Sequence, residues 1–223
     1  MSLTKEFFGT VDNYINALVA PQDDALIAAE RAIVESGIPQ ISVSANQGKF
    51  LQVLAKLCNA KKILEVGTLG GYSTIWMARG LAPGGKLITL EIDPKHADVA
   101  RKNFEVAGLG SVIDIRVGKA IDTMPELKDS NEGPFDMIFI DADKPPYAEY
   151  FQWALKLSRP GTLIVVDNVI REGKVLDANT TDESARGAHR FNKALSQTKG
   201  VTATIIQNIG AKEHDGMALV VVN

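Results

Sequence analysis

Short, strongly apolar runs alternate with amphipathic segments over most of this chain. Runs of this kind predict buried strands, and apolar residues at intervals of three and four predict helices. The strands are expected at residues 62–66, 86–91, 112–117, 136–141 and 162–167, and the helices between them at 72–81, 94–107, 120–127 and 147–158. This alternation predicts an α/β fold in which a mostly parallel sheet is covered by helices on both faces.

The N-terminal part departs from this alternation. Residues 1–40 predict two helices that form a helical cap, and the next helix is expected to begin at Ser44 or Asn46. Residues 41–223 contain no linker, internal repeat or low-complexity tract. We therefore expect residues 1–223 to form a single domain, with the cap at its start.

The C-terminal part predicts a different sheet connection. A polar loop at 171–183 and a helix near 184–197 precede two apolar strands at 201–207 and 217–222, which a polar turn at 210–216 joins. Strands joined so closely are antiparallel. The predicted sheet is therefore mixed, with an antiparallel hairpin at one side.

Acidic and amide side chains follow two of the predicted strands. One strand ends at Asp141, followed by Asp143 and Lys144, and the next ends at Asp167-Asn168, 26 residues after Asp141. That separation fits one strand, helix, strand unit, which sets the two carboxyl ends at the same edge of the sheet, about 5 Å apart. Either these oxygens bind a divalent cation or they form a costly cluster of like charge. We prefer the cation site.

A glycine-rich turn follows the first predicted strand. Gly67, Gly70 and Gly71 let the backbone approach a ligand closely, but they lack the G-x-G-x-x-G spacing of dinucleotide enzymes. The next strand ends at Glu91, 24 residues after Gly67, where an acid can accept hydrogen bonds from ribose hydroxyls. The glycines alone fit a simple tight turn, and Glu91 alone fits a solvated strand end. Together they indicate a site for a nucleoside cofactor.

Composition narrows the function classes. With 45% hydrophobic and 23% charged residues, the chain has the ordinary composition of a globular protein with a sizeable core. The net charge of −3 gives no reason to expect nucleic-acid binding. Cys58 is the only cysteine, which excludes an intrachain disulfide. The sequence shows no signal-peptide core and no apolar run of about 18 residues, so we expect no membrane contact and a cytoplasmic protein.

Four short motifs in this order carry a resemblance to a known family. They are ILEVGTLGGYS at 63–73, LEID at 90–93, FIDADK at 139–144 and DNVI at 167–170. The series resembles the metal-dependent class I O-methyltransferases that use S-adenosylmethionine, the group that contains the catechol and caffeoyl-coenzyme A O-methyltransferases. The DADK form at 141–144 is more similar to the caffeoyl-coenzyme A and bacterial branch of the family than to the catechol branch. The resemblance implies a Rossmann-like sheet of seven strands in the order 3-2-1-4-5-7-6, and a homodimer formed through the N-terminal helices.

The resemblance also implies roles for individual residues. Lys144 corresponds to the catalytic base, and the metal ligands correspond to Asp141, Asp167 and Asn168. The divalent cation is expected to be Mg²⁺, with Mn²⁺ or Ca²⁺ as alternatives. The positions that match cofactor contacts are Val43, Glu65, Gly67, Thr68, Ser73, Glu91, Ala120, Asp141 and Asp143.

Several alternatives stay open at this point. The leading hypothesis is methyl transfer from S-adenosylmethionine to a hydroxyl of a vicinal diphenol, a small phenolic substrate of the catechol or caffeoyl kind. The first alternative is methylation of a hydroxylated nucleoside in tRNA, and the less favoured one is a nicotinamide-dependent oxidoreductase. For Lys144, an ion pair with Asp141 or Asp143 is the alternative to a role as base. Asp167-Asn168 would also fit a turn or a helix cap.

Overall fold

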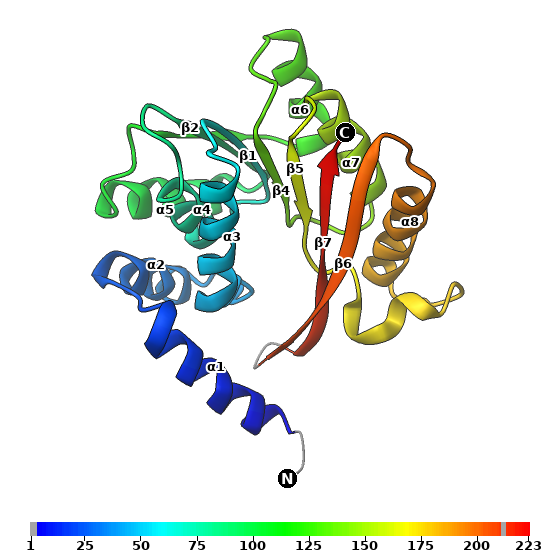
Figure 1. The fold of residues 1–223 in the computed structure, drawn as a ribbon. Helices are drawn as coiled ribbons and strands as arrows, with labels where there is room; N and C mark the ends of the chain where they lie inside the picture. Colours follow the sequence, from blue (N-terminus) through cyan, green and yellow to red (C-terminus); the bar gives the residue numbers. More distant parts are fainter. Residues whose placement is uncertain (1–3, 211–212) are drawn as a thin grey trace.

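The computed structural model describes residues 4–210 and 213–223. At its centre lies a seven-stranded sheet in the order β3-β2-β1-β4-β5-β7-β6, which is the predicted order (Figure 1). Strands β1 to β5 are parallel, and β7 runs antiparallel to both β5 and β6. The strands are β1 (Lys62–Val66), β2 (Lys86–Glu91), β3 (Ile113–Val117), β4 (Met137–Ile140), β5 (Leu163–Val166), β6 (Val201–Gly210) and β7 (Glu213–Val222).

Helices cover both faces of the sheet, and the N-terminal helices extend one of these layers (Figure 1). Helices α2 to α5 supply side chains to one buried cluster, and α6 to α8 supply side chains to the other. The helices are α1 (Lys5–Val19), α2 (Asp24–Glu35), α3 (Ala45–Leu57), α4 (Tyr72–Ala78), α5 (Pro94–Val106), α6 (Ala120–Asp129), α7 (Tyr147–Lys156) and α8 (Glu183–Gln197), with a short 3₁₀ segment η1 (Arg171–Leu176). Within the described residues, no helix is both long and apolar enough to cross a membrane.

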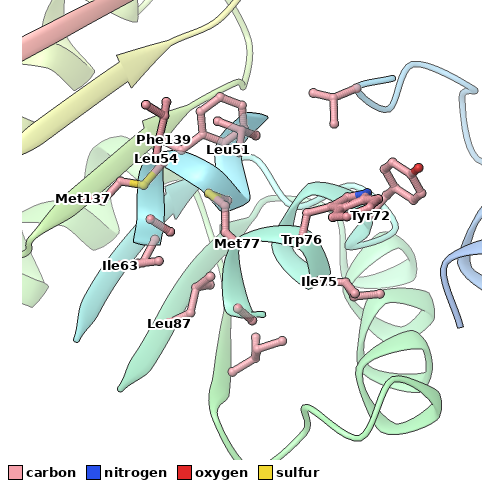
Figure 2. Packing of buried hydrophobic residues seen from close by; sticks show 14 of the residues in the cluster. Leu51, Leu54, Ile63, Tyr72, Ile75, Trp76, Met77, Leu87, Met137 and Phe139 are labelled. Carbon is pink, nitrogen blue, oxygen red and sulfur yellow. The ribbon is translucent and has the colours of Figure 1, made fainter. Parts of the chain in front are cut away.

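The two cores follow from the alternation of side chains along each strand. Ile63 of β1 packs in the cluster that contains Trp76 and Met77 of α4, as Figure 2 shows, whereas the next residue, Leu64, packs on the opposite face. The central strands β1, β4 and β5 have both faces buried. This explains why they appear in the sequence as continuous apolar runs rather than as an alternation of apolar and polar residues.

Local capping explains where two helices begin. The Ser44 side chain accepts a hydrogen bond from the Gln47 backbone, and the Gln47 side chain accepts one from the Ser44 backbone. This capping box selects Ser44, and not Asn46, as the residue that starts α3. Asp93 caps α5 with one hydrogen bond, which its side chain accepts from the Lys95 backbone N–H (2.8 Å), and Pro94 occupies the first turn of the helix.

The predicted turn at 210–216 is wrong in extent. The ladder between β6 and β7 continues through Asn208↔Asp215 and Ile209↔His214 to Gly210↔Glu213, so much of the polar segment is strand. Residues 211 and 212 lie outside the described part of the chain. The hairpin extends beyond its apolar residues. Its polar half lies outside the core, against α1 and the chain that follows β5, so the strand there has no apolar pattern in the sequence. The predicted polar loop at 171–183 likewise contains η1.

Candidate active site

A cavity of about 1450 Å³ opens where the parallel strands end. It brings together side chains from the ends of β2, β4 and β5, from the turn after β1, and from the loop before α3. Glu65 is the one predicted site residue that does not line it. The predicted residues in its wall are Val43, Gly67, Thr68, Ser73, Glu91, Ala120, Asp141, Asp143, Lys144, Asp167 and Asn168.

The turn after β1 needs glycine for two physical reasons. Gly67 has φ +99°, and a Cβ there would lie 2.2 Å from the carbonyl oxygen of Asp141. Gly71 has φ +84° at the start of α4, and a Cβ there would lie 2.4 Å from the ring of Phe104. The backbone of this turn therefore follows a path that L-residues rarely adopt, in close contact with Asp141 after β4 and with Phe104 of α5. This leaves the surface of the turn open to a ligand.

Glu91 holds this turn from the neighbouring strand. Its Oε2 accepts hydrogen bonds from the backbone N–H of Thr68 (3.2 Å) and Leu69 (2.7 Å), and its Oε1 accepts one from Asp93 (2.9 Å). Although only 5% exposed, the residue lines the cavity, where its carboxylate provides an acceptor for hydroxyl groups. The position agrees with the predicted role at a ribose.

His96 is a residue that the sequence argument did not place in the site. Its Nδ1 lies 3.5 Å from Glu91 Oε1, and the residue lines the cavity. The only signal in the sequence is its position in the first turn of the helix that begins just after Glu91. A surface histidine is also common at such a position, so no pattern in the sequence distinguishes a histidine of the site from one on the surface.

Glu65 lies behind the cavity wall, fully buried. Its carboxylate accepts hydrogen bonds from the hydroxyls of Ser73 (2.6 Å), Thr74 (2.5 Å) and Thr89 (2.6 Å). Burial raises the pKa of Glu65 to about 7, against these hydrogen bonds, which lower it. Glu65 therefore connects to the cavity wall directly through Ser73, and indirectly through Thr89, whose hydroxyl lies 2.6 Å from that of Thr68.

The two acid-ended strands are neighbours, as predicted. Ile140 of β4 pairs with Val166 of β5, and the backbone N–H of Asp167 donates to the Ile140 carbonyl (3.0 Å). Asp167 is 3% exposed, and desolvation together with the Asp141 charge raises its pKa to about 8. Asn168 has φ +56°, and its N–H donates to Asp167 Oδ1 (2.7 Å). A buried carboxylate, Asp167, and a partly exposed one, Asp141, thus lie together at one edge of the sheet.

This donor set fits a divalent cation. Two carboxylates and one amide are hard oxygen ligands, and a doubly charged ion offsets the like-charge repulsion that raises the Asp167 pKa. Among the described residues, no three His, Cys, Asp or Glu side chains group as a metal site. The predicted set differs from such a group because its third ligand is the amide of Asn168.

Lys144 is held at the same place by an ion pair. Its Nζ lies 2.8 Å from Asp141 Oδ1 and 5.0 Å from the centre of the Tyr147 ring, which is fully buried. The ion-pair alternative is therefore realised in this structure. The role as base stays a prediction, because the same contact also positions the amine beside Asp141, the predicted cation ligand. Asp143 points elsewhere, accepting a hydrogen bond from the Tyr150 hydroxyl (2.7 Å).

The outer wall of the cavity comes from three separate segments. Beyond the predicted N-terminal helices and the 171–183 loop, the polar half of the β6–β7 hairpin lines it. The sequence predicted the hairpin but not its polar half, because the residues of that half were interpreted as a turn. The residues that these segments contribute include Lys5, Asp12, Arg171, Glu172, Gln207, Asn208, Ile209, His214 and Asp215.

The fold and the site together define a class of protein. A parallel sheet with one antiparallel strand in the penultimate position, a glycine turn after β1 and an acid after β2 form the architecture of the class I methyltransferases. The O-methyltransferase family model matches residues 18–222. The chain belongs to the O-methyltransferase family, which confirms the predicted fold and enzyme class and leaves the nicotinamide alternative without support.

Individual relatives agree with this assignment. The chain is 63% identical over 220 residues to a catechol O-methyltransferase of Niastella koreensis, covering 99% of this chain and 100% of the relative. Its structure is similar to that of an O-methyltransferase from Bacillus cereus in complex with SAH, with a TM-score of 0.97, 45% identity, and coverage of 99% and 100%. It is also similar to the O-methyltransferase TomG from Streptomyces achromogenes in complex with SAM, with a TM-score of 0.96, 44% identity, and both chains covered fully.

Proposed function

We propose that this chain transfers the methyl group of S-adenosylmethionine to one hydroxyl of a vicinal diphenol, with a divalent cation held by Asp141, Asp167 and Asn168. The observation that carries the proposal is the contact between the two halves of the cavity. The glycine turn that fits the donor touches the backbone of Asp141, whose carboxylate pairs with the buried carboxylate of Asp167. A donor and a cation-bound acceptor would therefore meet within one cavity.

The donor is proposed to lie along the ends of β1 and β2. In this assignment Gly67, Thr68 and Ser73 bind its methionine end and Glu91 binds its ribose hydroxyls. Val43 from the loop before α3 and Ala120 at the start of α6 line the same cavity and would contact the rest of the nucleoside. Asp143 is assigned to the donor amino group, next to its hydrogen bond with Tyr150.

The cation is proposed to be Mg²⁺, with Mn²⁺ or Ca²⁺ as alternatives. When bound, a divalent cation would stabilise a phenolate oxygen, and two neighbouring hydroxyl oxygens of the acceptor could chelate it. A phenol has a pKa of about 10, so its neutral form predominates at pH 7 and is a poor nucleophile toward a sulfonium methyl group. Two neighbouring hydroxyl oxygens can chelate the cation, which supports a vicinal diphenol as the acceptor.

The chain's own residues supply the proton acceptor and the orientation. Lys144 lies at hydrogen-bond distance from Asp141 in the same cavity wall, and we propose that its neutral amine accepts the phenolic proton, after which the ion pair with Asp141 holds the resulting ammonium. The hydrogen bonds of Glu91 to the glycine turn and of Asp167 to Ile140 fix the two binding regions relative to the sheet. Holding the reacting groups in line is the main source of rate for a displacement without a covalent enzyme intermediate.

The test of this function combines binding with turnover. Calorimetry measures S-adenosylmethionine binding, and a methyl-transfer assay compares a vicinal diphenol with its mono-hydroxylated and 1,3-dihydroxylated analogues, with and without EDTA. We expect turnover of the vicinal diphenol alone, loss of turnover in EDTA, and recovery with Mg²⁺. Turnover of the 1,3-isomer at the same rate, or turnover unaffected by EDTA, would contradict the chelation mechanism. Methylation of tRNA in place of the diphenol would favour the nucleoside alternative.

We further propose that the protein is a cytoplasmic, single-domain homodimer. Helix α1 supports the dimer, because none of its residues is buried, and Tyr14, Leu18 and Val19 are each more than half exposed. Leu57 at the end of α3, the helix that α1 contacts, is 76% exposed. Sedimentation of the wild type and of Leu18→Glu tests the proposal: a dimer that becomes monomeric supports it, and a wild-type monomer rejects it.

A further inference from the structure

Asp215 binds the chain that follows β5 through its backbone. This residue of β7 accepts hydrogen bonds at one oxygen, Oδ1, from the backbone N–H groups of Ile170, Arg171 and Gly216, each at 2.9 Å. Its other oxygen, Oδ2, lies 3.7 Å from Arg171 Nη1. Two consecutive N–H groups from one segment therefore converge on one carboxylate from another, 44 and 45 residues further along the chain.

The segment held in this way begins with the proposed cation ligands. Three residues in it, Asn168, Arg171 and Glu172, have φ values of +56°, +52° and +58°. None is glycine, so each carries a backbone strain of about 1–3 kcal/mol that the surrounding structure must offset. Two further hydrogen bonds among the described residues hold this segment: the Val169 N–H donates to the Gly216 carbonyl of β7 (3.0 Å), and Asn192 Nδ2 of α8 donates to the Val169 carbonyl (2.8 Å). Contacts with β7, supported by one with α8, thus hold a backbone path that the local sequence does not favour.

We propose that Asp215 is a positioning residue for the cation site, which fixes the backbone that carries Asp167 and Asn168. The inference rests on the proposed function, because it supposes that these two residues bind a cation. Asp215 acts from a distance: its Oδ1 already accepts three N–H groups, and its Oδ2 faces a guanidinium. Without this carboxylate, the strained turn relaxes and the Asn168 amide loses its fixed direction relative to Asp167.

The chain offers a matched control at the opposite edge of the sheet. Asp136, just before β4, accepts the backbone N–H groups of Lys61 (2.8 Å) and Lys62 (2.9 Å) at one oxygen. Its other oxygen lies 2.5 Å from Arg159 Nη2. It therefore shares with Asp215 the two consecutive N–H donors, the arginine and partial burial, but it holds the amino end of the strands, away from the cavity.

The experiment measures cation binding without turnover. Calorimetric titration with Mn²⁺ is performed on wild type, Asp215→Ala, Asp215→Asn and Asp136→Ala, followed by titration of each with S-adenosylmethionine. Supporting partners of metal ligands typically change metal affinity by about 10- to 100-fold. We expect such a loss for Asp215→Ala, with donor affinity retained, and no loss of Mn²⁺ affinity for Asp136→Ala. Asp215→Asn keeps a carbonyl acceptor for the N–H groups and should restore most of the affinity.

The outcomes separate the two levels of inference. If wild type binds no Mn²⁺, the proposed cation site is rejected, and this inference falls with it. If wild type binds Mn²⁺ and Asp215→Ala binds it equally well, only the positioning role is rejected. An equal loss in Asp215→Ala and Asp136→Ala would also reject it, because the loss would then report general destabilisation. Should Asp215→Ala not fold, Asp215→Glu takes its place, because it keeps the charge but displaces the carboxylate from the two N–H groups. A loss of Mn²⁺ affinity without a matching loss of thermal stability would then support the positioning role, and unchanged affinity would reject it.

Discussion

The α-carbon of Gly67 faces the main-chain carbonyl of Asp141, so closely that a Cβ atom at position 67 would lie 2.2 Å from its oxygen. Gly67 belongs to the turn proposed to bind the methyl donor, and Asp141 to the carboxylate pair proposed to bind the cation. The backbone N–H of Asp141 also donates to Val66, the residue before Gly67 (2.9 Å). The two binding regions are therefore mechanically joined at the centre of the sheet.

Gly67→Ala tests this contact, and Gly84→Ala is its control. Both glycines have positive φ, +99° and +75°, so both substitutions carry the left-handed strain of about 1–2 kcal/mol. No described atom lies within 4 Å of a Cβ at Gly84, whereas Gly67 adds the collision with Asp141. We expect Gly67→Ala to lose about 1–3 kcal/mol more stability by urea unfolding, and to bind S-adenosylmethionine more weakly. Equal losses in both variants would show that the contact yields without cost.

Lys144→Ala and Lys144→Arg separate the base from the ion pair. Removing a general base typically lowers kcat by about 10²- to 10⁴-fold, and we expect a loss in that range for Lys144→Ala, with donor affinity unchanged by calorimetry. Arginine can keep the ion pair with Asp141, but it does not release its proton in proteins. A Lys144→Arg enzyme as active as wild type would mean that Lys144 serves only to hold Asp141.

Glu91→Gln tests the donor site on β2. The glutamine keeps the size of the side chain but removes the charge that strengthens the hydrogen bonds to Thr68 and Leu69 and to ribose hydroxyls. Hydrogen bonds to charged groups contribute about 1.5–3 kcal/mol, so we expect a donor Kd raised by about 10- to 100-fold. Asp93→Asn is the control, because asparagine caps α5 equally well. Similar Kd changes in both variants would assign the effect to α5 and not to Glu91.

Glu65 is expected to make stability depend on pH. Its pKa rises from about 4.5 when unfolded to about 7 when folded, so the folded state binds the proton more tightly. The free energy of unfolding should therefore fall as the pH rises from 4.5 to 7, by about 3 kcal/mol, and stay level above that. Urea unfolding at intervals across this window should show the fall in wild type, beyond that in Glu65→Gln. The raised pKa of Asp167 acts in both proteins, so their difference isolates Glu65. Parallel curves would contradict the raised pKa.

The central sheet was predictable because each of its features depends on the local sequence. The strands β1, β4 and β5 are buried on both faces. A strand in this position needs apolar residues on both faces, so it can be identified from a short continuous apolar run in the sequence. The position of Asp141 beside Asp167 then followed from the geometry of a parallel strand pair. The two acids and the glycine turn reach one cavity because all lie at the same edge of one sheet.

The outer part of the site was not predictable in this way. Asn208 and Asp215 lie in strands because they pair with each other in the extended ladder of the hairpin, although their own residue types favour a turn. Asp215 contacts Ile170 across 45 residues, and His96 approaches Glu91 from a different element. Such contacts depend on tertiary packing, which a hydrophobic pattern does not encode.

Helix α1 adds a consequence for how acceptors enter. It lines the cavity through Lys5 and Asp12, yet none of its residues is buried, although the structure describes the whole helix. An isolated helix of this length is only marginally stable, so α1 depends on its contacts with α3 and β6 and, in the proposed dimer, on the second copy of the chain. Formation of the proposed dimer would therefore fix the rim of the acceptor site as well as cover the outer face of α1.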